Sequence, residues 1–209
     1  YFKHVVVGAG GRGDFLWGLA ISATMVLVAV LSPVLGAIAD SAGKKRPFLI
    51  FFAGMAIAST YALSFVGPGM VAAGMALFVT GYLGYTAAMP FYNGFLMEVA
   101  PRERWPRTSG FGWGLGYIGG LCSLLMILPF AKAGVTAEGA SSARAIFLMT
   151  GTFFLLFALP AFLFLKDRPH PQSADGVGRG GYLGAGFSRL GATFRTVREH
   201  RELWKFFLA

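Results

Sequence analysis

One carboxylate and three cations lie close together in the stretch that links the first two long apolar runs of the chain. The stretch reads G-x-x-x-D-x-x-G-K-K-R, and its fixed positions are Gly36, Asp40, Gly43, Lys44, Lys45 and Arg46. Gly36 and Asp40 are one helical turn apart and share a helix face, while Gly43 suits a tight turn. A carboxylate at a membrane helix end is costly unless it is paired. We therefore predict that Asp40 forms a breakable ion pair and that the motif is a conformational switch.

The next charged stretch along the chain supplies candidate partners for this switch. They are Glu98, Arg102, Arg104 and Arg107. The arginines are the expected partners of Asp40, and such a pair would latch two helix ends together on one side of a membrane. The alternative interpretation is that the Lys and Arg residues only fix the orientation of the chain in the membrane.

The composition indicates that lipid, not water, surrounds the elements that position these residues. Of the 209 residues, 56% are hydrophobic and 13% are charged, whereas soluble domains carry about 25% charged residues. No Asp, Glu, Lys, Arg or His occurs between Phe48 and Met97. A bilayer core needs only about 20 apolar residues per helix, so we predict an all-α integral membrane protein.

Five apolar runs have the length of membrane spans, and we expect each to be helical because lipid offers no hydrogen bonds to the backbone. They cover residues 15–39, 48–66, 70–97, 108–130 and 145–165. Residues 1–14 are predicted to be an outer loop and residues 166–202 a cytoplasmic loop. Part of that loop is either an amphipathic surface helix or a linker. Position 1 is Tyr and not Met, and residues 203–209 read as the start of another apolar helix, so we expect that both chain ends are truncations.

The charges alternate between successive loops, which predicts the orientation. Residues 40–46, 98–107 and 166–205 carry net charges of +2, +1 and +4, whereas 67–69 and 131–142 carry none. Basic loops stay in the cytoplasm, so we expect five spans with Tyr1 outside, in the inner membrane of a bacterium. The cations are spread over short clusters, so the net charge of +9 does not indicate a nucleic-acid partner.

The glycine motifs predict packing and no cofactor. Gly8, Gly10 and Gly13 spell G-x-G-x-x-G, but no βαβ unit follows that could bind a dinucleotide. The predicted helix-packing residues of the fourth span are Gly112, Gly116, Gly119 and Gly120. Small residues at four-residue spacing let membrane helices approach closely. Cys122 is the one cysteine of the sequence, and we expect no metal site.

The switch motif resembles the signature of the major facilitator superfamily, with Ile38 in place of its usual Leu. The stretch PFYNGFLMEVAPRERWPRTSGFGWGLGYIGG narrows the resemblance to vacuolar amino-acid effluxers of the autophagy type and their bacterial relatives. The resemblance covers essentially all five spans. It implies a fold of two six-helix halves, with the first helix missing ahead of Tyr1 and the C-terminal half as a partner. It also implies that Gly36 packs against the other half and that Asp40 caps and pairs there.

The family resemblance also implies a solute path, because the family's fourth helix lines the central cavity and corresponds here to residues 70–97. The candidate solute-lining residues are Tyr85, Met89, Tyr92 and Asn93 on this helix and Trp113 and Tyr117 on the next. The first three share a face by their spacing, and Asn in hydrocarbon seeks a polar partner. The alternative is that these aromatic residues only pack or sit at the membrane interface.

The function implied by the resemblance is secondary active transport of small solutes, amino acids being candidates, by alternating access. No charged side chain lies in the middle of a span, so the sequence assigns no coupling ion. Two other functions stay open: a membrane signalling or scaffold protein, and a membrane-embedded enzyme. The enzyme is disfavoured because the acidic cluster of Glu98 and Glu103 has no His beside it.

Overall fold

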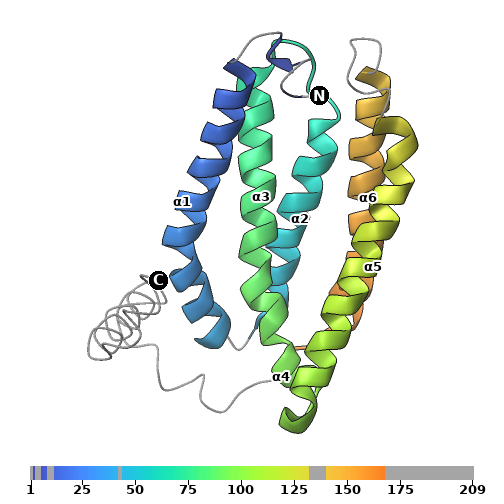
Figure 1. Cartoon of the computed structure of the whole chain (residues 1–209). Coiled ribbons are helices and arrows are strands. Elements are labelled where there is room, and N and C mark those ends of the chain that lie inside the picture. Colours follow the sequence, from blue (N-terminus) through green and yellow to red (C-terminus); the bar gives the residue numbers. More distant parts are fainter. Residues whose placement is uncertain (1, 3–5, 9–11, 42–43, 132–139, 168–209) are drawn as a thin grey trace, which may run out of the picture.

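The chain folds into five long helices without a strand in the part that the structure describes (Figure 1). A computed structural model describes residues 2, 6–8, 12–41, 44–131 and 140–167, apart from the side chains of 33, 37–41 and 140. The long helices are α1 (Arg12–Ser41), α2 (Arg46–Leu63), α3 (Val71–Gly94), α5 (Trp105–Ala131) and α6 (Ala140–Phe164). All five are long and apolar enough to cross a membrane. The predicted all-α membrane fold with five spans is confirmed.

The helix ends differ by a few residues from those expected from hydropathy. Helix α1 begins at Arg12, so Asp14 lies in its first turn, where a carboxylate favours the positive end of the helix dipole. Helix α2 ends at Leu63, and the chain then turns through Gly69, whose φ of +80° favours glycine. Helix α3 contains Pro90 and is followed by the short helix α4 (Leu96–Val99) and the 3-10 turn η2 (Arg102–Arg104).

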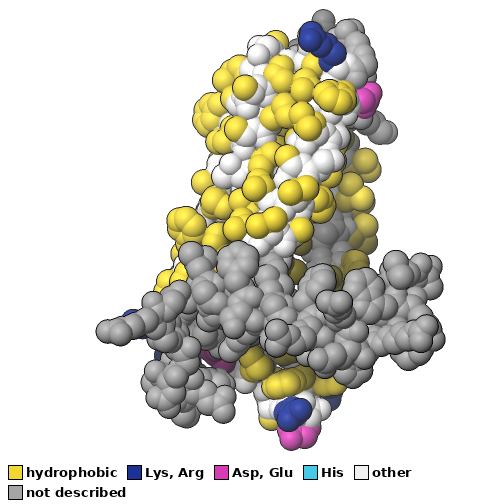
Figure 2. All heavy atoms as spheres, turned by 90° about the vertical axis from the view of Figure 1, so that its left-hand side faces the viewer, with side chains coloured by type: hydrophobic (Ala, Val, Ile, Leu, Met, Phe, Trp, Pro, Cys, Tyr) yellow, Lys and Arg dark blue, Asp and Glu magenta, His cyan; other side chains and the backbone are white. Residues whose placement is uncertain are grey.

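The long helices run alternately up and down, so the loops fall at two ends of the bundle (Figure 1). One end, which we call the basic end, carries seven cations with described side chains: Lys44, Lys45, Arg46, Arg102, Arg104, Arg107 and Lys166. The opposite end carries Arg12 and Arg144. Figure 2 shows a hydrophobic face between charged side chains at top and bottom. This distribution fits a bundle whose apolar middle lies in lipid.

The tightest packing joins α2 to α3. A Cβ atom added at Gly84 of α3 would lie 2.7 Å from the Phe52 carbonyl oxygen and 2.9 Å from the Ala56 nitrogen of α2. The two backbones therefore approach too closely for any side chain at position 84. Toward the basic end, Phe91 is fully buried and stacks on Phe48, with ring centroids 5.1 Å apart. Helix α3 also packs against α1, and α2 packs against α6.

Helix α5 is the least covered of the long helices, since it has no buried residue and packs mainly against α6. Within the described residues, nothing lies within 4 Å of a Cβ atom added at any of its predicted packing glycines: Gly112, Gly116, Gly119 and Gly120. None of the described helices is thus their close partner. Their role in packing stays a prediction for a helix other than these.

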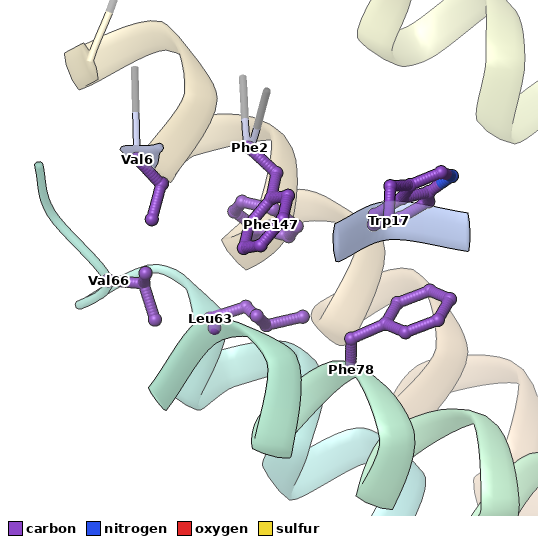
Figure 3. Close-up of a pocket in the computed structure, with 8 residues that line it drawn as sticks. Phe2, Val6, Trp17, Leu63, Val66, Phe78 and Phe147 are labelled. Carbon is purple, nitrogen blue, oxygen red and sulfur yellow. The ribbon is translucent and has the colours of Figure 1, made fainter. Parts of the chain in front are cut away.

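An apolar cavity of about 240 Å³ lies at the opposite end. Figure 3 shows its lining side chains, which come from the N-terminal segment, from α1, α2, α3 and α6, and from the turn after α2. Phe2 of the N-terminal segment and Phe78 of α3 both pack against the ring of Trp17, with centroids 5.8 Å and 4.5 Å away. The lining is apolar, so packing holds these side chains against one another.

Candidate functional site

Lys45 and Glu98 form a buried ion pair at the basic end. The Lys45 Nζ and the Glu98 Oε1 are 3.0 Å apart, and the two side chains are only 8% and 5% exposed. The ammonium group also donates to the carbonyl oxygen of Gly94, at 3.2 Å. Because Gly94 ends α3, this carbonyl has no partner further along the helix and carries the negative end of the helix dipole. Lys45 thus connects the start of α2 to the end of α3 and to α4.

Asp167, just after the end of α6, connects that helix to the start of α2. Its Oδ1 accepts hydrogen bonds from the backbone N–H groups of Lys45 and Arg46, at 2.8 Å and 2.9 Å. These groups lie at the N-terminus of α2, where a carboxylate satisfies free donors and favours the helix dipole. Arg46 reaches back and donates through Nε and Nη2 to the carbonyl oxygen of Phe162, at 2.9 Å and 2.6 Å.

The basic end is therefore a three-way junction, which we call the inner junction and define by Lys45, Arg46, Glu98 and Asp167. It joins α2 to α3 and α4 on one side and to α6 on the other. Every bond in it is charge-assisted, and such bonds are stronger and more directional than neutral ones. Breaking the junction would release three helix ends at once.

The predicted switch residues have different places around this junction. Lys45 and Arg46 belong to it and Glu98 is its acidic member, whereas Lys44 is exposed beside it. Gly36 is half-buried in α1, and its added Cβ would meet no described atom within 4 Å. The Asp40 side chain and Gly43 lie outside the described residues, so the expected pairing of Asp40 with an arginine stays a prediction.

The three arginines predicted as partners lie apart from the inner junction. Arg102, Arg104 and Arg107 are exposed on η2 and the first turn of α5. Asp167, which completes the junction, was not predicted. Its sequence signal is a lone carboxylate two residues after the fifth apolar run, but nothing in the sequence indicates that this residue reaches the start of α2.

A cleft of about 660 Å³ opens beside the junction between α3, α5 and α6. Five of the six predicted solute-lining residues border it: Tyr85, Met89, Tyr92, Asn93 and Trp113. Tyr117 is not among its lining residues, but its ring lies 6.3 Å from that of Trp113. The face of α3 and the turn of α5 that were predicted to line a solute path therefore border the same cleft.

The chemistry of this cleft is neutral. Its polar lining groups are the Tyr85 and Tyr92 hydroxyls, the Asn93 amide, the Trp113 indole and the hydroxyls of Thr108 and Ser109. None of the lining residues carries a charge. Aromatic faces and hydrogen-bonding groups in an apolar wall suit a small neutral or zwitterionic solute. Thr108 and Ser109 also line the cleft but were not among the predicted solute-lining residues. The sequence feature that could have indicated them is their position one helical turn before Gly112 and Trp113.

The described residues include no group of three His, Cys, Asp or Glu side chains that could hold a metal ion. The ionisable residues of the inner junction instead pair with one another and with backbone groups. This arrangement can hold helix ends together and let them separate.

Comparisons with known proteins point to a family of membrane transporters. The chain matches the family described as "Vacuole effluxer Atg22 like" over residues 16–104 and 97–209. It is 29% identical to the uncharacterized MFS-type transporter YxiO of Bacillus subtilis over 196 residues, 92% of this chain and 45% of the relative. It is also 29% identical to Autophagy-related protein 22-1 of Penicillium rubens over 108 residues, 49% of this chain and 18% of the relative. The chain spans less than half the length of either relative. No solved structure matches it.

Proposed function

The chain belongs to the vacuole effluxer Atg22-like family of major facilitator transporters, and from this membership we propose that the full-length protein moves small solutes across a membrane by alternating access. The chain is a multi-pass integral membrane protein with five candidate spans. Amino acids are the solutes that we propose, and the inner membrane of a bacterium is the location.

The observation that carries the proposal is the neutral cleft between α3, α5 and α6. It brings Tyr85, Tyr92 and Asn93 of α3 to the same cavity as Trp113 of α5. A free amino acid is a zwitterion with a short body, so it needs hydrogen bonds at one end and an apolar or aromatic contact at the other. The cleft wall offers both, and the rest of the binding site would come from the remainder of the full-length protein.

The inner junction supports the alternating-access mechanism in this proposal. Alternating access needs helix ends that are held in one state and released in another. The Lys45–Glu98 pair and the Asp167 contacts hold three such ends by charge-assisted bonds. Exchange of these bonds for others would let one group of helices rock against another without unfolding either.

The proposal is tested by transport with the full-length protein reconstituted in proteoliposomes. Uptake of radiolabelled neutral amino acids should saturate with concentration. Trp113→Ala should raise KM about tenfold, which is equivalent to about 1.4 kcal/mol of solute binding. Phe157→Ala is the matched control, since Phe157 is an exposed aromatic residue that does not line the cleft. Flux of a broad panel of amino acids equal to that of empty liposomes would refute the proposed solute class. Equal KM changes in the two variants would refute the role of the cleft.

A further inference from the structure

A proline interrupts α6 where that helix borders the cleft. Pro160 lies inside α6, is exposed, and is among the residues that line the cleft. Proline has no backbone N–H, so the carbonyl group of Leu156, four residues earlier, does not receive the hydrogen bond that an α-helix normally provides. Helix carbonyl groups point along the axis toward the residue four positions later, so the Leu156 oxygen lies on the same face as Pro160. Helix α6 therefore presents a backbone acceptor at the wall of the cleft.

Two other carbonyl groups that have no partner within their helix are bound by cations of this chain. Gly94 ends α3, and its carbonyl oxygen accepts a hydrogen bond from the Lys45 ammonium group, at 3.2 Å. Phe162 lies in the last turn of α6, and its carbonyl oxygen accepts from the Arg46 guanidinium group, at 2.9 Å and 2.6 Å. A carbonyl group without a partner is costly in apolar surroundings. This bundle thus pairs such groups with cationic donors.

The Leu156 carbonyl group receives no side-chain donor from the described part of the chain. The side-chain hydrogen bonds to backbone oxygens there reach other residues: Ala20, Ala56, Tyr61, Tyr82, Gly94, Ala100 and Phe162. None of the residues that line the cleft carries a charge, so the lining has no cation to offer this oxygen. A carbonyl oxygen accepts hydrogen bonds and cannot donate one. A partner for it must bring N–H or O–H groups, and an ammonium group brings three N–H groups.

We propose that the Leu156 carbonyl oxygen binds the ammonium group of the transported amino acid. This proposal rests on the proposed function, in which the solute binds in the cleft. The positive end of the zwitterion then lies against α6. Donors for its carboxylate come from the Asn93 amide and the Trp113 indole, which line the same cleft. Specificity for a primary ammonium group thus comes from a backbone atom that Pro160 leaves without its helical partner.

The first measurement uses the wild-type full-length protein in proteoliposomes, with glycine and its N-methylated derivatives as inhibitors of radiolabelled amino-acid uptake. Each methyl group replaces one N–H donor of the ammonium group, so glycine betaine, the trimethylated compound, has none. All members of the series are zwitterions. Inhibition should weaken with each methyl group, and glycine betaine should require a concentration at least about tenfold higher than glycine. Equal inhibition by glycine and glycine betaine would overturn the proposal.

The second measurement compares two variants that each replace a proline inside a long helix. Pro160→Ala supplies an N–H group that binds the Leu156 carbonyl oxygen, so glycine should inhibit about tenfold less well while inhibition by glycine betaine changes less than about twofold. Pro129→Ala is the matched control, because it makes the same change in α5 and Pro129 does not line the cleft. The preference for glycine over glycine betaine should fall in Pro160→Ala alone. An unchanged preference in Pro160→Ala, or equal losses in both variants, would overturn the proposal.

The outcomes distinguish this proposal from the proposed function. Saturable amino-acid uptake whose preference for glycine survives Pro160→Ala would leave the proposed solute class standing and overturn only the role of the Leu156 carbonyl group. Absence of uptake for every amino acid tested would refute the solute class and this proposal with it. If Pro160→Ala does not fold, Pro160→Gly restores the same N–H group and takes its place in the comparison.

Discussion

Different kinds of interaction stabilise the two ends of the helix bundle. At the basic end, Lys45 and Glu98 form a buried ion pair, and Asp167 caps α2. At the opposite end, Trp17 packs between aromatic rings beside an apolar cavity. The N-terminal segment is tied there by a backbone bond from the Gly69 N–H to the Val6 carbonyl oxygen, at 2.9 Å.

This difference indicates where a conformational change can be controlled. Lipid tails are as apolar as Leu or Phe, so apolar contacts between membrane helices gain little beyond van der Waals packing. Such contacts can slide without a large change in energy. Charge-assisted hydrogen bonds are directional and are either formed or broken. We therefore expect the basic end to have two discrete arrangements and the opposite end to adjust gradually.

The largest effect should follow from removing one member of the buried ion pair. Lys45→Met removes the ammonium group that faces the buried Glu98 carboxylate, and breaking a buried pair in this way costs about 3–5 kcal/mol. The thermal unfolding temperature of the full-length protein in detergent should fall steeply. Lys44→Met is the matched control, because Lys44 is the neighbouring lysine and is exposed. Its removal should change stability by less than about 0.5 kcal/mol.

A double variant sharpens this first prediction. Lys45→Met combined with Glu98→Leu removes both charges and leaves neither unpaired. It should recover much of the stability lost in the single variant, because burying one charge of a pair without the other is costly. If Lys44→Met and Lys45→Met were equally destabilising, the ion pair would not be what holds the basic end.

A smaller effect is expected at the cap formed by Asp167. Asp167→Ala removes the acceptor for the N–H groups of Lys45 and Arg46, and loss of a helix cap costs about 0.5–2 kcal/mol. Asp167→Asn keeps an oxygen acceptor and should cost less. Unfolding curves of the two variants, measured in the same detergent, give the comparison. A larger loss in the Asn variant than in the Ala variant would contradict the capping role of the oxygen atom.

The fold could be predicted from the sequence because lipid imposes a simple rule on it. Fifty residues without a charge, from Phe48 to Met97, cannot remain in water, and backbone groups in lipid must be paired within helices. The lining of the cleft was predictable in part for a related reason. The spacing of Tyr85, Met89 and Tyr92 places them on one helix face, and that face borders the cavity.

The sequence could not predict which helix faces pack against each other, because two helices carry similar stripes of small residues. Gly116 and its neighbours on α5 were predicted to pack, yet the close approach lies at Gly81 and Gly84 of α3, against α2. Both helices have small residues at compatible spacings, and the sequence does not say which faces meet. Asp167 was missed for the same reason, since its contact with Arg46 crosses 121 residues of sequence.

The smallest effect should follow from a change at the opposite end. Trp17→Leu removes two ring contacts but keeps an apolar side chain, so it should cost about 0.5–1.5 kcal/mol, the value of an aromatic pair. The loss should be the same in low and high salt, because no charge is involved. Unfolding temperatures of the full-length protein, measured at two salt concentrations, provide the test. A salt-dependent loss in Trp17→Leu would mean that charge also holds this end, and the contrast between the two ends would no longer stand.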